Sequence, residues 1–344
     1  MWIIPGLKRS ERVRSLLKQL RKPLDAGYDR MRRARLKRKI DLTGQAAHDY
    51  LRAQIESGRP FMACRFGYTE LSKMRAYEKL VAGYRRGRRY DSSDYAKIFK
   101  SLEFMSGFFP ITPAQVARFY HRMMEDMKEI DVLGSWLTRE LDVEANLSGV
   151  VRVELHDLDP VIRRNAHPWT SVLRGKRVLV VHPFDRSIRA QYPKRKLLFE
   201  NPETLPDFEL LTLRAVQNPA WNFAKHDNGD RSYHGASREF SDWFEALHHM
   251  EREISALEFD IALIGCGAYG LPLAAHVKRM GRQAVHLGGV TQMLFGIKGD
   301  RWVKAYGFTR FNEHWVWPLP EETPEESGIV EKCGTYWGGA SETL

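Results

Sequence analysis

One short segment combines an arginine, a glycine and a glutamate directly after an apolar run. The segment reads ACRFGYTEL, and the three residues are Arg65, Gly67 and Glu70. A guanidinium at such a corner could bind a phosphate through two parallel hydrogen bonds. A carboxylate there could bind a metal ion or orient a sugar hydroxyl. The structural alternative is that Glu70 only complements the dipole of a helix that starts here.

A glycine-rich segment later in the chain could also bind phosphate. Gly265, Gly267 and Gly270 form a GxGxxG pattern between an apolar run and a helical pattern, a context in which backbone N–H groups attract phosphate. A dinucleotide site also needs a carboxylate about 20 residues later, near the ribose. Residues 285–289 contain none, so NAD is not expected. A phosphate cradle of another kind and a tight turn that needs glycine for steric reasons both stay open.

Four more polar residues stand near the ends of predicted strands. His182 and Asp185 lie at the end of one apolar run, and His286 and Gln292 end or follow another. His182 or Asp185 could act as the base for an acceptor hydroxyl, and His286 and Gln292 could bind a donor molecule. The structural alternative for each is a hydrogen bond within the fold.

Several common catalytic and metal-binding patterns are missing from the sequence. It has no GxSxG, HExxH or GxxxxGK[ST] motif, which argues against the common hydrolase, zincin and P-loop classes. The three cysteines, Cys64, Cys266 and Cys333, are widely separated and lack zinc-site spacing. We therefore expect neither a disulfide framework nor a structural zinc site, and a reducing, cytoplasmic setting.

Alternating strand and helix patterns predict how these residues are positioned. Strands are predicted over residues 61–66, 177–184, 208–216, 260–266 and 283–287, and helices over 42–57, 71–81, 113–130, 237–257 and 271–280. This order predicts an α/β fold with a Rossmann-like, mostly parallel sheet, a helical N-terminal part and a basic N-terminal arm. Ligands bind beyond the carboxyl ends of strands in such sheets, so the polar residues above should meet at one rim.

The formal charge of +11 is concentrated at the N-terminus. Residues 1–40 hold 14 Lys and Arg against three acidic residues, so the remaining 304 residues carry no net charge. A basic, partly amphipathic arm of this kind could dock on an anionic membrane surface. A solvated extension is the alternative, and nucleic-acid binding is not expected because no recognition motif accompanies the charge.

We expect residues 41–344 to form a single α/β domain. Within it, residues 41–150 are predicted to be a helix-rich part that carries the RFG motif. Residues 151–310 are predicted as the Rossmann-like part, and residues 311–344 as a wrapping tail rich in Trp, Pro and Glu.

The segment ACRFGYTEL resembles the RFGDGE-type motif of the GT-D fold glycosyltransferases, a family formerly grouped as a domain of unknown function. The block DIALIGCGAYGLPLAAHVKRMGRQAVHLGG resembles the second glycine-rich strand–helix–strand block of that family, and the resemblance spans roughly residues 45–310. It implies a nucleotide-sugar donor and a divalent metal held by a DxE motif. Arg65, Gly67 and Glu70 carry over from the first block, and Gly265 and Gly267 from the second.

The chain departs from the motif at one position. Tyr68 stands where the motif has aspartate, while Glu70 keeps the glutamate. A single carboxylate is a poor divalent-cation site without further ligands. The resemblance implies Mn or Mg as a cofactor, held at Glu70. The replacement of the motif aspartate by Tyr68 argues against such a metal.

The sequence as a whole predicts a glycosyltransferase that moves a sugar from a nucleotide-sugar donor to a glycan, glycoconjugate or lipid-linked acceptor in surface polysaccharide assembly. The donor diphosphate would lie against residues 265–270 and Arg65, and Glu70 would bind the donor sugar or the leaving diphosphate. We expect a cytoplasmic protein, peripheral at the inner face of the membrane through residues 1–40. The alternative is a non-catalytic nucleotide- or glycan-binding partner of a membrane assembly, in which Tyr68 marks a decayed site.

Overall fold

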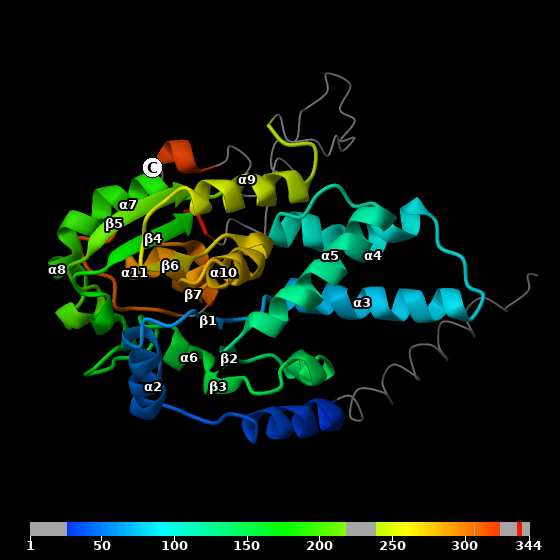
Figure 1. Ribbon diagram of the computed structural model, residues 1–344, viewed down its shortest axis with the longest axis horizontal. Helices are drawn as coiled ribbons and strands as arrows, with labels where there is room; N and C mark the ends of the chain where they lie inside the picture. The colour runs from blue at the N-terminus through cyan, green and yellow to red at the C-terminus, as the bar shows by residue number, and fades with distance from the viewer. Residues whose placement is uncertain (1–25, 218–238, 306, 324–335, 339–344) are drawn as a thin grey trace, which may run out of the picture.

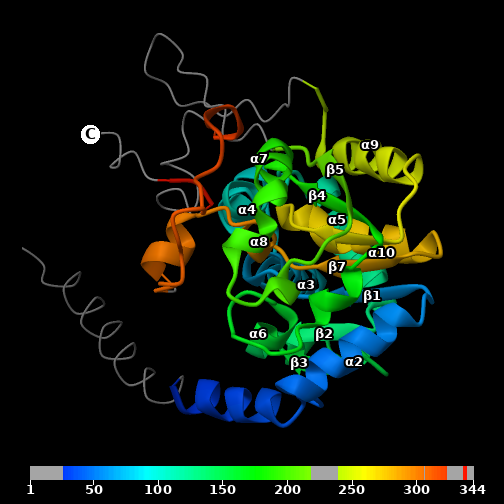
Figure 2. The same cartoon turned by 90° about the vertical axis from the view of Figure 1, so that its left-hand side faces the viewer.

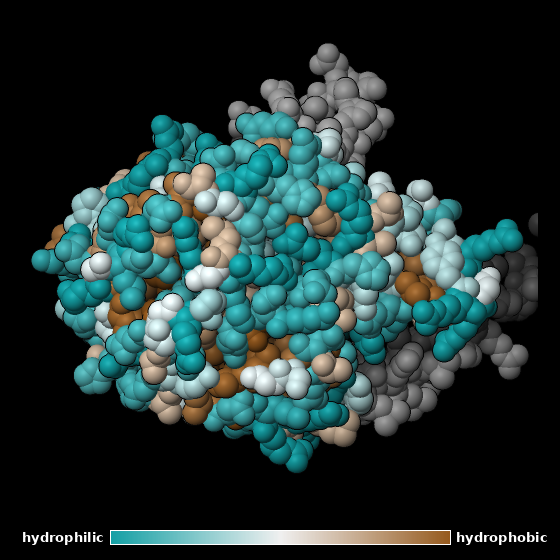
Figure 3. Space-filling model, in the orientation of Figure 1, coloured by the Kyte–Doolittle hydropathy of each residue, from teal (hydrophilic) through white to brown (hydrophobic). Residues whose placement is uncertain are grey.

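The computed structural model describes residues 26–217, 239–305, 307–323 and 336–338. The first 25 residues of the basic arm, most of the tail and Cys333 therefore lie outside the described residues. Among those that are described, no helix combines the length and the apolar character needed to cross a membrane. On the face shown in Figure 3, hydrophobic residues form small separate patches among hydrophilic ones.

A seven-stranded, all-parallel sheet organises the molecule, in the order β3-β2-β1-β7-β6-β4-β5. Figure 2 shows this order running from β3 at the bottom to β5 at the top. The strands are β1 (Phe61–Cys64), β2 (Val132–Ser135), β3 (Val151–Glu154), β4 (Arg177–His182), β5 (Glu209–Arg214), β6 (Ile261–Ile264) and β7 (Gln283–His286). The predicted α/β, Rossmann-like class is confirmed.

Helices cover both faces of the sheet, and α3, α4 and α5 extend to one side of it (Figure 1). Their bounds are α2 Gln45–Glu56, α3 Tyr68–Arg85, α4 Ser92–Ser106, α5 Pro113–Asp126, α6 Leu155–Leu158, α7 Asp185–Gln191, α8 Arg195–Leu198, α9 Trp243–Ser255, α10 Gly270–Arg279 and α11 Val290–Leu294. Residues 26–37 form a further helix at the N-terminal end of the described chain.

In every strand except β3, alternate residues enter two different hydrophobic cores, as the period of two in a strand requires. In β1, Met62 and Cys64 pack with α3, α4, α5, α9 and α10, whereas Phe61 and Ala63 pack with α2, α7, α8 and α11. The described parts of the tail contribute the buried Trp315 and Trp337 to this second core. Burial on both faces is typical of a parallel sheet and explains its continuous apolar runs.

The five predicted strands all form, but β2 and β3 were missed. Strand β2 has only four residues, and one of them is Gly134. Strand β3 reads VRVE, and its Arg152 is buried in an ion pair with Glu140 rather than exposed. A charged residue inside a short strand hides the apolar pattern that identifies buried strands. The basic, polar stretch 85–100 predicts a loop and a short helix, whereas the structure has the 15-residue helix α4 there.

Candidate active site

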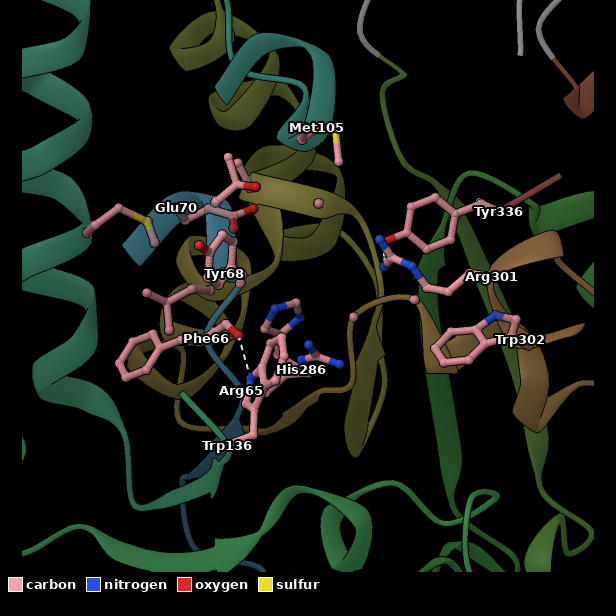
Figure 4. Close-up of a pocket in the computed structure, with 18 residues that line it drawn as sticks. Arg65, Phe66, Tyr68, Glu70, Met105, Trp136, His286, Arg301, Trp302 and Tyr336 are labelled. Atoms are coloured by element: carbon pink, nitrogen blue, oxygen red, sulfur yellow. Dashed lines mark hydrogen bonds between the residues drawn. The ribbon is translucent and has the colours of Figure 1, made fainter. Parts of the chain in front are cut away.

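A cavity of about 470 Å³ opens at the carboxyl ends of β1, β2, β6 and β7. Five of the ten residues singled out from the sequence line it: Arg65, Gly67, Glu70, Gly267 and His286. They come from two segments, 65–70 and 267–286, which the parallel sheet brings to one rim, where α/β folds bind ligands. Trp136, Arg301, Trp302 and Tyr336 complete much of the wall (Figure 4).

Arg65 presents a guanidinium group to this cavity with no hydrogen bond or ion pair to the described residues. Its guanidinium carbon lies 4.8 Å from the ring centroid of Trp136, so one face of the group is held by a cation–π contact. The indole of Trp136 donates to the carbonyl of Phe66 at 3.0 Å, which fixes the ring in place. The N–H groups of Arg65 are therefore oriented and available to an anionic ligand.

Arg301 lies on the other side of the cavity from Arg65 (Figure 4). Its Nη1 donates to the hydroxyl of Tyr336 at 2.8 Å, and its guanidinium carbon lies 4.9 Å from that ring centroid. Each of the two arginines is thus steadied by an aromatic residue. Two guanidinium groups on opposite walls of one cavity form an arrangement suited to a diphosphate.

Glu70 occupies the first turn of α3 and its carboxylate folds back over Gly67, where a Cβ would collide with it. The side chain is buried, and burial raises its pKa; its own backbone N–H and the charges of Arg65 and Arg301 partly oppose the shift. A buried carboxylate with a raised pKa, facing a cavity, is well placed to accept a proton. It also complements the dipole of α3, so the structural alternative and the chemical one coexist at this residue.

His286 is buried at the end of β7 and lines the cavity beside Arg65 (Figure 4). Burial lowers its pKa to about 4, so the imidazole is neutral at pH 7. Its Nδ1–H donates to the carbonyl of Ile264 at 3.1 Å, which leaves Nε2 as a hydrogen-bond acceptor. A neutral acceptor here can bind a sugar hydroxyl but cannot hold a phosphate by charge.

The glycine-rich loop after β6 is shaped mainly by close contacts within the protein. A Cβ at residue 265 would lie 2.5 Å from the carbonyl oxygen of Gly288, and one at residue 267 would lie 2.9 Å from that of Ser106. Gly267 has a φ of +56°, which also favours glycine. Steric need therefore accounts for Gly265, while Gly267 is both sterically required and part of the cavity wall.

Gly270 makes room for His286, because a Cβ there would collide with the imidazole ring. It does not line the cavity. We expect Gly270→Ala to lower the free energy of unfolding by about 1–3 kcal/mol, since the buried ring has to move. Urea unfolding at pH 7 measures the loss.

The matched control for this prediction is Gly27→Ala, within helix 26–37. That position has open space around it and no positive φ, so alanine should leave stability unchanged or raise it by up to about 1 kcal/mol. Equal stability of the Gly270→Ala variant and the wild type would contradict the packing role of this glycine.

His182 lies in a smaller neighbouring cavity of about 90 Å³, which also includes Gly265, Phe184 and Trp337. Burial lowers its pKa to about 3, and its Nδ1 accepts the backbone N–H of Phe184 at 3.0 Å. The proton of the neutral ring is therefore on Nε2, and the residue can donate to a ligand but is poorly suited to act as a base.

Asp185 and Gln292 line neither cavity. Asp185 begins α7, and its Oδ2 pairs with Arg189 at 2.7 Å. The fully buried Gln292 donates to the carbonyls of Lys298 at 2.8 Å and Tyr336 at 3.2 Å. Asp185 therefore lies outside the walls of both cavities, and Gln292 supports the backbone of Tyr336.

Three residues of the cavity wall are not predicted from the sequence: Trp136, Arg301 and Tyr336. Trp136 directly follows β2, so the rule that placed the other residues would have found it had that strand been recognised. Arg301 and Tyr336 lie beyond the last strand, in segments without a strand or helix pattern.

Asp159 was also missed: it is buried, its pKa is raised to about 7 by burial, and the charge of Arg65 acts against that shift.

The residues of the cavity do not fit a divalent cation. Among the described residues, Glu70 is the one carboxylate that lines it, and Arg65 and Arg301 bring positive charge to the same space. Within the described part of the chain, no three His, Cys, Asp or Glu side chains lie close enough to hold a metal. Tyr68, at the aspartate position of the motif, is 55% exposed and packs with the guanidinium of Arg139 at 5.4 Å. The chemistry proposed below therefore involves the protein's own groups alone.

Comparison with known proteins gives two structural likenesses. Both are to solved structures of domain of unknown function 1792, and one of these is described as having a distinct glycosyltransferase fold. The likenesses cover 85% and 86% of this chain and 95% and 98% of those chains, at 13% and 12% identity and TM-scores of 0.39 and 0.40. This is the class of protein that the RFG motif resembles. No protein-family profile and no curated protein matches the chain. Likeness at this level gives no information about substrates. A function for this chain therefore has to be argued from the residues of the cavity.

Proposed function

We propose that the protein is a glycosyltransferase that uses a nucleotide-sugar donor. The observation that supports this most is the pair of oriented guanidinium groups, Arg65 and Arg301, on opposite sides of a cavity that also holds one buried carboxylate, Glu70. Transfer from such a donor releases a diphosphate. In many enzymes, preorganised positive groups aimed at developing negative charge supply much of the rate enhancement.

In the proposed reaction, an acceptor hydroxyl attacks the anomeric carbon of the donor sugar as the bond from that carbon to the diphosphate oxygen breaks. Glu70 accepts the hydroxyl proton, and its raised pKa suits that role. Arg65 and Arg301 stabilise the charge that develops on the departing diphosphate. This assignment replaces the expectation that Asp185 or His182 is the base, because Glu70 is the residue of the three that lines the cavity.

The smaller cavity is suited to the nucleoside end of the donor. It adjoins the first one, and its wall includes the apolar side chains of Phe184 and Trp337. The two cavities share four lining residues: Met105, Gly267, Gly289 and Tyr336. An aromatic, mostly apolar wall can stack a base. The donor would then lie across the rim of the sheet, with its diphosphate in the larger cavity.

Thermal-shift binding of UDP-, GDP- and CMP-sugars, followed by a hydrolysis assay, tests the function. We expect one donor class to bind, to be hydrolysed slowly without acceptor, and to lose at least about 100-fold in turnover in Glu70→Gln. Each assay is run with a chelator and with manganese, and we expect equal binding in both because the guanidinium groups take the place of a metal.

The outcomes of this experiment separate the alternatives. Binding without turnover on any acceptor would favour the non-catalytic binding partner. Lack of binding by every nucleotide sugar would contradict both the transferase and the binding partner. Activity that requires manganese would contradict the role given to the guanidinium groups while leaving the transferase intact.

We further propose that the enzyme acts on a glycan or lipid-linked acceptor at the cytoplasmic face of a membrane, in surface polysaccharide assembly. The basic arm supports this, although its second half packs against the body: Arg32 pairs with Asp142 at 2.9 Å and Lys39 with Glu144 at 2.6 Å. Residues 1–25 are therefore the segment to delete. Loss of cosedimentation with phosphatidylglycerol vesicles is expected, and unchanged cosedimentation would contradict membrane docking by this segment.

A further inference from the structure

A further cavity, of about 460 Å³, lies beside the candidate active site, and we call it the basic groove. Helix 26–37, helix α3 and the segment 137–142 form its walls. Its lining includes two carboxylates, Asp29 and Asp142, and five cationic side chains: Arg32, Arg33, Arg75, Lys79 and Arg139. Arg32 and Arg33 belong to the basic arm, whereas Arg75, Lys79 and Arg139 belong to the body, which carries no net charge, so the arm and a local cluster of the body together form this groove.

Part of this charge is neutralised inside the groove and part is not. Arg32 pairs with Asp142 at 2.9 Å, and Arg75 lies 3.7 Å from the same carboxylate and also pairs with Glu78. Arg33, Lys79 and Arg139 have no carboxylate partner among the described residues. Arg139 lies against Tyr68, and its hydrogen bond and its charge lower the pKa of that hydroxyl. Paired arginines hold the walls together, whereas Arg33 and Lys79 beside them are available to a bound anion.

Tyr68 connects the groove to the active-site cavity, because its side chain lines both. Its ring packs with the guanidinium of Arg139 on the groove side, two residues before Glu70 in the same turn of α3. A molecule with an anionic group in the groove can therefore extend past Tyr68 to the proposed base. In the proposed function, the donor diphosphate occupies the site formed by Arg65 and Arg301. An anionic group bound in the basic groove would therefore belong to the other substrate, the acceptor.

We propose that the basic groove binds a phosphate or diphosphate group carried by the acceptor. This rests on the proposed glycosyltransferase function and names the acceptor class, a phosphate-linked acceptor such as a lipid diphosphate. The groove positions the acceptor by its phosphate, and the hydroxyl that receives the sugar lies beside Glu70. Tyr68, at the position where the motif has aspartate, forms the passage between the two substrates.

Isothermal titration of the full-length protein with farnesyl diphosphate tests this assignment. We expect binding that the double substitution Arg33→Glu/Lys79→Glu weakens by at least about tenfold, because two attractive charges become repulsive. Farnesol, which lacks the diphosphate, should not bind. The nucleotide-sugar affinity of the same variant should stay within about twofold of wild type, since neither residue lines the donor cavity.

Two further variants separate the groove from other sources of the effect. Lys196→Glu/Arg252→Glu makes the same charge change at exposed residues of α8 and α9, and it should bind farnesyl diphosphate like the wild type. Equal weakening in that control would overturn the proposal, since the effect would then follow from net charge. Weakening in Arg65→Ala but not in the groove variant would also overturn it, by placing the ligand in the donor cavity.

Binding to phosphatidylglycerol vesicles distinguishes an individual phosphate-linked acceptor from the headgroups of bulk lipid. If phosphatidylglycerol vesicles bind through Arg33 and Lys79 while soluble farnesyl diphosphate does not, the groove holds bulk lipid headgroups and the proposal is wrong. The experiments can contradict the proposed anion site and the proposed transferase function separately. Farnesyl diphosphate binding that depends on Arg33 and Lys79, without binding of any nucleotide sugar, would contradict the proposed function and retain the anion site.

Discussion

Replacement of Arg65 by alanine is expected to lower kcat/KM for the nucleotide-sugar donor by about 100- to 1,000-fold. The guanidinium has its ring contact with Trp136 and no competing ion pair among the described residues, so its hydrogen-bonding capacity faces the cavity. The loss should be mainly in kcat, because charge on the diphosphate develops as the sugar departs. Steady-state kinetics on the donor identified by binding measures it.

Two variants control this experiment. Arg65→Lys keeps the charge but loses the planar fork and the ring contact, so we expect an intermediate loss of about tenfold. Arg59→Ala removes an exposed arginine at the opposite, amino end of β1 and should change neither kcat nor KM. Wild-type kinetics for Arg65→Ala would mean that this arginine is only a structural partner of Trp136.

Replacement of Arg152 by methionine is expected to lower the free energy of unfolding by about 3–5 kcal/mol. Arg152 and Glu140 are both buried and pair at 3.1 Å. The second oxygen of Glu140 accepts the backbone N–H groups of Trp136 at 2.9 Å and Leu137 at 2.8 Å. Without Arg152 the carboxylate stays buried with no opposite charge, and the turn that carries Trp136 becomes less rigid.

The double variant Arg152→Met/Glu140→Gln separates the charge from the packing. Its amide oxygen can still accept both backbone N–H groups, so most of the lost stability should return. Burial raises the pKa of Glu140, and without Arg152 that pKa should rise further. The deficit of Arg152→Met should therefore shrink as the pH falls through this raised pKa, because the folded state then binds the proton more tightly than the unfolded state. Urea unfolding at several pH values follows this, and a deficit that persists in the double variant would contradict the charge explanation.

The sequence predicts residues of this site best where a polar group stands at the end of an apolar run that is recognisable as a strand. Arg65, Gly67 and Glu70 follow β1, and His286 ends β7, so the rule that ligands bind at carboxyl strand ends placed all four on the cavity wall. The same rule failed for Asp185, because α7 begins at once after β4 and its first residue pairs with Arg189 within that helix. A rule based on strand ends cannot tell which way a side chain turns.

The remaining features depend on contacts between segments far apart in the chain. Trp136 was not predicted because Gly134 interrupts the short apolar run of β2, the strand that it follows. Strand β3 was not recognised either, because it contains the charged Arg152, which Glu140 neutralises in the fold. Arg301 is recognisable only through its contact with Tyr336, 35 residues later. Similarly, the glycines of the GxGxxG pattern look alike in sequence, and only their neighbours distinguish Gly270, which makes room for His286, from Gly267 on the cavity wall.

The proposed function depends above all on two guanidinium groups that hold the diphosphate of a nucleotide donor without a metal ion. Isothermal titration in the presence of a chelator tests this, with a nucleoside diphosphate and its parent nucleoside added to wild type, Arg65→Ala and Arg65→Ala/Arg301→Ala. We predict that the diphosphate binds wild type at least about 100-fold more tightly than the nucleoside, and that the double variant loses most of this difference. Equal affinity of the diphosphate and the nucleoside for the wild type, or a preference that survives in the double variant, would contradict it.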